Sequence, residues 1–178
     1  MNWKSKYSIE FKGLKEGLHE FDFKVDGRFF EHFEGSLVDT GEAKITVLLE
    51  KHSTFIQLQL KIIGWLELVC DRCLETYRQE ITNEAELFIK FGEETFNEGE
   101  NVIWVLPEEH AINLTQPIYE YVSLSIPLRH IHPKNEKGKR GCNPEMLKNL
   151  KKFTHSKREE NETTDPRWDV LKLLKNNN

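Results

Sequence analysis

The sequence predicts an α+β protein in which a long-stranded antiparallel meander sheet is covered by C-terminal helices. Apolar and polar residues alternate with period 2 through residues 56–70 and 77–91, as in strands with one buried face. After residue 115, apolar residues recur at helical spacing instead. The chain of 178 residues contains 11 Phe, 4 Trp and 4 Tyr, which is enough bulky material for one core. We therefore expect a single α+β domain over residues 1–153.

The predicted strands follow one another along the first half of the chain. Residues 7–14 and 18–25 are expected to be strands, and residues 28–33 a short helix. A strand over residues 44–50 turns at His52 and Ser53 into the long strand 56–70, in which Gly64 marks a bulge or bend. The next turn, at residues 70–73, leads into the long strand 77–91, and a short strand over 102–106 follows. Consecutive long strands joined in this way form an antiparallel meander.

Two helices are predicted in the second half. Residues 115–125 have helical spacing, and Pro127 ends this helix because a proline restricts the residue before it. Asn143 and Pro144 open a second helix, which extends to about residue 153, since Asn caps helices and Pro fits the first turn.

The last part of the chain is expected to be a tether and a short helix. Residues 154–164, THSKREENETT, contain no side chain suited to a core and are predicted to be a flexible linker. Asp165 and Pro166 begin an amphipathic helix over residues 165–175. Its apolar face consists of Trp168, Leu171 and Leu174. A helix this short is not stable alone, so it docks either on the body of the protein or on a partner.

Charge is unevenly distributed. The net charge is −5, yet residues 129–158 contain ten Lys or Arg and two acids, a local charge of +8. The remainder has 15 bases and 28 acids, a charge of −13. The basic segment is either a solvated loop that compensates the acidic body or a surface that follows phosphates.

The sequence also favours a cytoplasmic protein with no membrane partner. Its longest apolar run, residues 62–66, is far shorter than the about 20 residues of a membrane-spanning helix. The N-terminal residues MNWKSKYSIEFKG contain no apolar signal-peptide core. The three cysteines cannot all pair within the chain, and a C-x-x-C in a reducing compartment indicates a metal site or a redox pair before a structural disulfide.

Cys70 and Cys73 lie at the predicted hairpin turn, where two thiolates can face one tetrahedral ion. Zinc takes four N or S ligands, so Cys142 and one of the histidines His130 and His132 would complete the set. Alternatively, the cysteines are small turn residues with free thiols. A thioredoxin-like redox role is less favoured, because no βαβ pattern surrounds the motif.

No catalytic constellation is apparent in the sequence. The glycines are scattered, no serine lies in a Gly-x-Ser-x-Gly turn, and the acids of residues 93–109 are typical of a solvated stretch. A metal-dependent hydrolase using the same cysteines and histidine would need an open coordination position and a general base, and the sequence indicates neither. We therefore expect a protein that is not an enzyme.

Three motifs in this order resemble the YceD family, which is linked to the accumulation of large-subunit ribosomal RNA. They are Cys70-Asp71-Arg72-Cys73-Leu74, Ile112-Asn113-Leu114 leading into Ile126-Pro127, and Asp165-Pro166-Arg167-Trp168 with Leu171 and Leu174. The resemblance covers roughly residues 40–175. It implies a cytoplasmic, non-catalytic accessory factor for 23S rRNA processing or large-subunit assembly, with ribosomal RNA or ribosomal proteins as partners and a suspected metal- and nucleic-acid-binding role.

The resemblance also selects site residues. Cys70, Arg72 and Cys73 match the family's C-x-R-C, and His132 and Cys142 fit the histidine and cysteine that follow its Ile-Pro. His130 stands where a proline is more usual, which favours His132 as the ligand. The basic insertion between His132 and Cys142 is longer than expected for the family.

These expectations combine into one hypothesis. Zinc bound by Cys70, Cys73, His132 and Cys142 would fix the hairpin tip against the 127–142 loop. The two segments would then present six basic residues to rRNA phosphates, namely Arg72, Arg129, Lys134, Lys137, Lys139 and Arg140. The alternative is a protein-interaction module that acts through the Trp168 helix without touching RNA.

Overall fold

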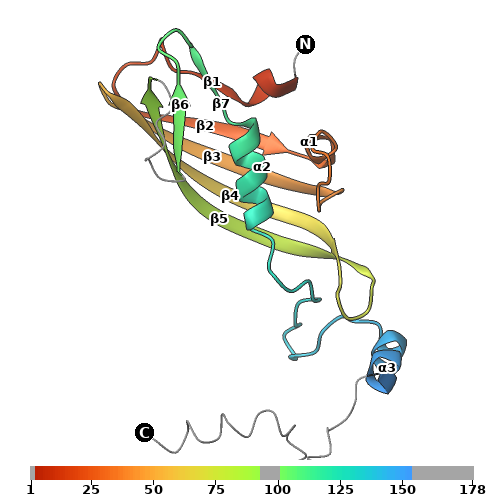
Figure 1. Cartoon of the computed structure of the whole chain (residues 1–178). Helices are drawn as coiled ribbons and strands as arrows, with labels where there is room; N and C mark the ends of the chain where they lie inside the picture. The colour runs from red at the N-terminus through yellow and green to blue at the C-terminus, as the bar shows by residue number, and fades with distance from the viewer. Residues whose placement is uncertain (1–2, 93–100, 154–178) are drawn as a thin grey trace, which may run out of the picture. The chain divides into compact units, whose positions relative to one another are not determined.

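The computed structural model of the protein describes residues 3–92 and 101–153 (Figure 1). Its main element is a five-stranded sheet whose strands lie side by side in chain order, β2-β3-β4-β5-β6. The bounds are Gly17–Val25 for β2, Gly41–Lys51 for β3, Phe55–Val69 for β4, Thr76–Phe91 for β5 and Val102–Val105 for β6. Three consecutive antiparallel pairings join β2 through β5, so the predicted meander and the α+β class are confirmed.

The remaining elements are short. A second sheet pairs β1, Ser8–Glu10, with β7, Ala111–Asn113. The helices are the 3-10 helix η1, Trp3–Tyr7, and the α-helices α1, Gly27–Phe30, α2, Thr115–Leu124, and α3, Pro144–Phe153.

The structure corrects two predictions near the N-terminus. Residues 7–14 do not form one strand, because η1 ends at Tyr7, β1 spans only three residues, and the N–H of Leu14 donates to the carbonyl of Phe11 in a turn. The helix expected over residues 28–33 is the shorter α1. In addition, β6 pairs with β5 in the parallel sense, a pairing that alternation within single strands does not reveal.

The core lies on one face of the main sheet. Even positions of β4 and odd positions of β3 and β5 are buried or half-buried, as their alternation predicts. Helix α2 lies across this face in Figure 1, with Ile118 and Val122 buried. The side-chain amide of Asn83 on β5 donates to the carbonyl of Tyr121 at 2.8 Å, which ties the helix to the sheet.

The chain divides into two compact units between Cys142 and Asn143. The first contains both sheets, and the second contains α3, whose N-terminus is capped by the Asn143 carboxamide oxygen accepting from the N–H of Glu145 at 2.9 Å. The expected linker and the expected Trp168 helix lie outside the described residues, so the boundaries at residues 154–164 and 165–175 stay a prediction. Among the described helices, none has the length and apolar character needed to cross a membrane.

Candidate metal centre

The turn between β4 and β5 positions two of the cysteines. We call residues 70–75 the cysteine turn. The N–H of Leu74 donates to the Cys70 carbonyl at 2.9 Å, and the N–H of Cys70 donates to the Glu75 carbonyl at 2.9 Å. Leu74 has φ +60, a left-handed conformation that lets the chain reverse tightly enough to enter β5. The turn leaves Cys70 and Cys73 almost fully buried, at 0% and 1% exposure.

A second, smaller hairpin lies between His132 and Cys142. We call residues 134–140 the basic hairpin, because Lys134 and Arg140 pair across it as an antiparallel bridge. The carboxamide oxygen of Asn135 accepts from the N–H groups of Lys137 and Lys139 at 3.1 and 2.9 Å. By folding back on itself, this hairpin returns Cys142 toward His132, which explains how the long basic insertion fits between two residues of one site.

The hairpin also ties its own ends together. The guanidinium of Arg140 donates to the His132 carbonyl at 2.9 Å, and a side chain at Gly141 would meet the His132 ring. On the other side, the His132 ring packs against that of Tyr77 with centroids 4.9 Å apart. The Arg140 bond thus fixes the backbone of His132, and the Tyr77 ring packs against its imidazole.

The cysteine turn and the second segment are joined by the main chain as well. The N–H of Asp71 donates to the carbonyl of His130 at 2.7 Å, and the N–H of His130 donates to the Asp71 carboxylate at 2.7 Å. His130 thus contributes backbone atoms to the junction, whereas His132 contributes its ring.

Four potential ligand atoms meet at this junction. One atom each from Cys70, Cys73, His132 and Cys142 lies within 4.8 Å of the other three. The sulfurs of Cys70 and Cys142 are 3.9 Å apart, and the Cys73 sulfur is 3.5 Å from Nδ1 of His132. In a tetrahedral zinc site with bonds of about 2.0–2.3 Å, neighbouring ligand atoms are about 3.3–3.8 Å apart. The donor set is one that zinc takes, and these two separations lie within or close to that range.

The electrostatics favour a thiolate at Cys70. Burial raises the pKa of this thiol, but hydrogen bonds from the backbone of Arg72 and from the backbone and ring of His132 outweigh it and lower the pKa from 9.0 to about 6. At Cys142, burial and the neighbouring sulfurs of Cys70 and Cys73 raise the pKa. A metal ion binds cysteines as thiolates, so a thiol that is already deprotonated favours binding. The other cysteine thiols would release their protons when the ion binds.

The expected nucleic-acid residues lie beside this junction. Arg72 is half-buried within the cysteine turn, and Arg129 is exposed just before His130. The other four, Lys134, Lys137, Lys139 and Arg140, are exposed on the basic hairpin. The expected partner-binding residues Trp168, Leu171 and Leu174 lie outside the described residues.

Sequence reasoning overlooked two residues that shape the site. Neither Asp71 nor Asn135 was predicted to belong to the site. A local pattern does indicate the role of Asn135. Asn followed three residues later by Gly is typical of a turn in which the glycine is left-handed, and Gly138 has φ +72. The link from Asp71 to His130 joins residues 59 positions apart, which no local pattern contains.

Comparison with protein families decides where this chain belongs. The family model described as large ribosomal RNA subunit accumulation protein YceD matches residues 58–175, from β4 through all the ligand candidates. The chain belongs to the YceD family. The match confirms the resemblance inferred from the motifs, and the family description implies involvement in large ribosomal subunit RNA accumulation. Comparison with curated proteins gave no match, and comparison with solved structures gave none either.

Proposed function

We propose that this YceD-family chain is a non-catalytic accessory factor for 23S rRNA processing or large-subunit assembly in the cytoplasm, and that it binds rRNA through a surface fixed by zinc. The single observation that supports this proposal is the meeting of four ligand atoms from the cysteine turn and the 132–142 segment within 4.8 Å. Because the basic hairpin connects two of those ligands, any metal held there also fixes the hairpin.

The chemistry of the ligand set favours a structural role over catalysis. Zinc bound by three thiolates and one imidazole has all four positions filled by protein, as in closed structural sites. Such an ion would contribute folding free energy and leave no position for a water nucleophile. Cys70, Cys73, His132 and Cys142 would hold the ion, and the chain around them would provide the binding surface.

The charge of that surface supports RNA as the ligand. Residues 129–140 carry five Lys or Arg and one acid, in a chain whose net charge is −5. Lysines and arginines that contact phosphates release counterions and give affinity without base readout. RNA shape or a protein partner would then supply the specificity.

The experiment compares binding of a labelled 23S rRNA fragment by the full-length chain and by the double variant Lys137→Gln/Lys139→Gln. Asn135 holds the backbone N–H groups of both lysines, so the hairpin turn should survive. The matched control is Lys15→Gln/Lys61→Gln, which removes two exposed lysines from the first unit outside the hairpin. We expect weaker binding by the hairpin variant alone, with the slope of log affinity against log salt reduced by about 1.4 for two lost single-strand phosphate contacts. Equal binding by the two double variants would overturn the role of the hairpin.

The family match extends to residue 175 and so includes Trp168, Leu171 and Leu174. This supports a second candidate, a protein-interaction module in which residues 165–175 bind a ribosomal protein. Deleting residues 156–178 separates the two functions. Loss of a protein partner with RNA binding retained favours the module, whereas loss of both indicates that the segment belongs to the RNA-binding body.

A further inference from the structure

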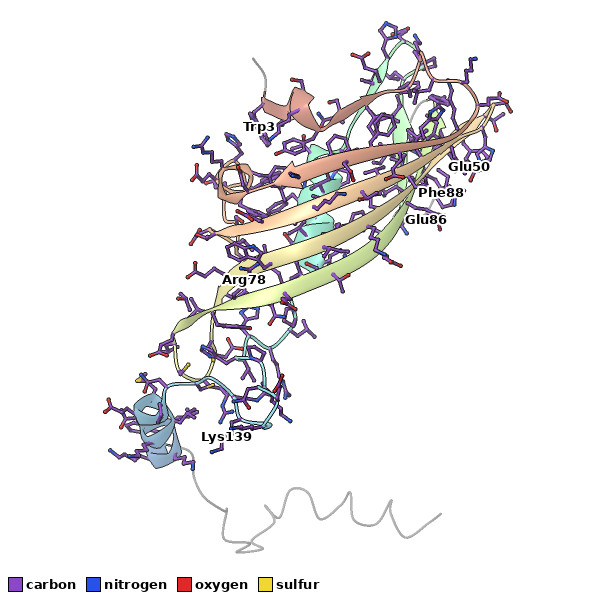
Figure 2. The ribbon with its side chains drawn as sticks, turned by 180° about the vertical axis from the view of Figure 1, so that it is seen from behind. Trp3, Glu50, Arg78, Glu86, Phe88 and Lys139 are labelled. Atoms are coloured by element: carbon purple, nitrogen blue, oxygen red, sulfur yellow. The ribbon has the colours of Figure 1, made fainter. Side chains whose placement is uncertain are left out.

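One face of the main sheet has no layer packed on it in the described part of the chain. Helix α2 covers the core face, and Figure 2, which views the sheet from the opposite side, shows β2 through β5 with their outward side chains in front. We call this the open face. Most of its side chains are charged, as expected for a surface exposed to water.

Trp65 is an exception to that polar pattern. It occupies an outward position of β4, where the alternation otherwise places residues such as Gln57, Gln59 and Lys61. The guanidinium of Arg78 lies over the Trp65 ring at 4.2 Å from its centroid. The neighbouring Ile63 is 54% exposed on the same face. An aromatic ring, a planar cation and an exposed aliphatic chain thus form one platform.

This platform lies in a hollow of about 520 Å³ with a basic lining. Its charged residues are four bases, Lys6, Lys24, Lys44 and Arg78, and two acids, Asp26 and Glu42. Lys44 also pairs with Asp22, 3.0 Å away. A second hollow of about 510 Å³ on the same face has the opposite balance, with Lys61 against Glu20, Glu84 and Glu86. The lining of the hollow beside Trp65 therefore has more bases than acids, whereas the second hollow is acidic. The two residues paired with Trp65 across the sheet, Glu42 and Glu80, are themselves acidic.

Gly64 belongs to the lining of the basic hollow. A Cβ at this position would lie only 2.6 Å from the Cα of Ala43 on β3. The close approach of β3 and β4 therefore requires glycine here, because the backbone of β3 fills the place of a side chain.

We propose that the open face around Trp65 binds single-stranded RNA, with one unpaired base stacked on the Trp65–Arg78 pair and the adjacent phosphates beside Lys24 and Lys44. The choice of RNA rests on the proposed function. The platform supplies an aromatic ring on which a base can stack, and the basic hairpin has no such ring. Bases stack on aromatic rings and on guanidinium planes, and lysines around such a platform follow the backbone. Arg78 lies near the end of the sheet at which the cysteine turn begins, so one RNA strand would reach both surfaces (Figure 2).

The test measures binding of a fluorescein-labelled RNA single strand of about ten nucleotides by the full-length protein. The variants are Trp65→Leu, which removes the ring, and Trp65→Phe, which retains an aromatic ring. Trp104→Leu is the matched control, because Lys90 lies over the Trp104 ring at 5.9 Å, but Trp104 is on β6 and outside the basic hollow. Arg78→Gln provides a second route if Trp65→Leu does not fold, which far-ultraviolet circular dichroism establishes first.

We expect Trp65→Leu to weaken binding about five- to 150-fold, and Trp65→Phe and Trp104→Leu to change it little. An abasic strand of the same length should bind Trp65→Leu and the wild type alike, since it has no base to stack. Wild-type affinity for Trp65→Leu, or for Arg78→Gln if the first variant is unfolded, would overturn the inference. An equal loss on the abasic strand would overturn it as well.

The same assay separates this inference from the proposed function. A loss with Lys137→Gln/Lys139→Gln and none with Trp65→Leu refutes the platform and leaves the hairpin surface. The reverse result refutes the hairpin surface and supports the platform.

Discussion

Asp71 and His130 exchange two hydrogen bonds of 2.7 Å, one between backbone atoms and one from the His130 N–H to the Asp71 carboxylate. These bonds join the cysteine turn to the segment that contains His132 without using any candidate ligand atom. The two segments are therefore held together by hydrogen bonds that need no metal, and a bound metal would link them a second time.

The variant Asp71→Ala tests the bond to the carboxylate. We expect the free energy of unfolding to fall by about 1 kcal/mol, because the His130 N–H loses its carboxylate acceptor. The carboxylate is exposed to water, so this hydrogen bond contributes less than a buried one would. Urea unfolding followed by tryptophan fluorescence measures the change. Glu80→Ala removes an exposed carboxylate of β5 as the control. Equal stability of the two variants would mean that the hydrogen bond from His130 to the Asp71 carboxylate contributes nothing to the free energy of unfolding.

Metal content distinguishes the two histidines. We expect about one zinc per chain in protein purified without a metal-binding tag, and a clear loss in His132→Gln after dialysis against a chelator. His130→Gln is the matched control, since it changes the same residue type two positions away and leaves the backbone bonds to Asp71 possible. Elemental mass spectrometry gives the stoichiometry. Retention by His132→Gln, or absence of zinc from the wild type, would contradict the proposed ligand set.

The pKa of Cys70 predicts how the stability of the metal-free chain depends on pH. Its folded pKa, lowered from 9.0 to about 6, means that the unfolded chain binds the extra proton between those values. Stability should therefore rise from pH 6 to pH 9, and this contribution should be lost as the pH falls through about 6. Urea titrations with a chelator present measure it. Cys70→Ser should lack this slope, and an unchanged slope would assign the effect to another group.

Gly64 provides a prediction about the sheet itself. Gly64→Ala should lower the free energy of unfolding by about 1–3 kcal/mol or more, because the new methyl group meets the backbone of β3 rather than a flexible side chain. Gly13→Ala is the control, since a Cβ there meets nothing within 4 Å. Thermal unfolding of the two variants checks the difference, and a stable Gly64→Ala protein would show that β3 and β4 can separate without cost.

Much of the fold was predictable because its signals are local. Alternation along residues 56–70 and 77–91 reports a strand with one buried face, whichever partner it pairs with, and it predicted β4, β5 and the turn between them. Strand β1 was overestimated, since a few apolar residues near the N-terminus do not distinguish a strand from a 3-10 helix and a turn.

The candidate metal centre was predictable only in part. The C-x-x-C spacing indicated two ligands at a hairpin turn, and the need for four ligands indicated Cys142 with His130 or His132. The family resemblance then favoured His132 over His130. The four ligand atoms come together because the basic hairpin folds back and because Asp71 and His130 are hydrogen-bonded to each other. The second of these contacts joins residues 59 positions apart in the chain.

The sequence by itself determined the α+β class, the meander, the cysteine turn and the family, because periodicity and motif spacing are properties of neighbouring residues. Only the tertiary structure decided the parallel partner of β5, the grouping of the four ligand atoms and the basic hollow around Trp65. Each of these features arises where separate segments of the chain pack together. The free energy of that packing comes from apolar surface buried between segments, which the sequence of one segment alone does not reveal.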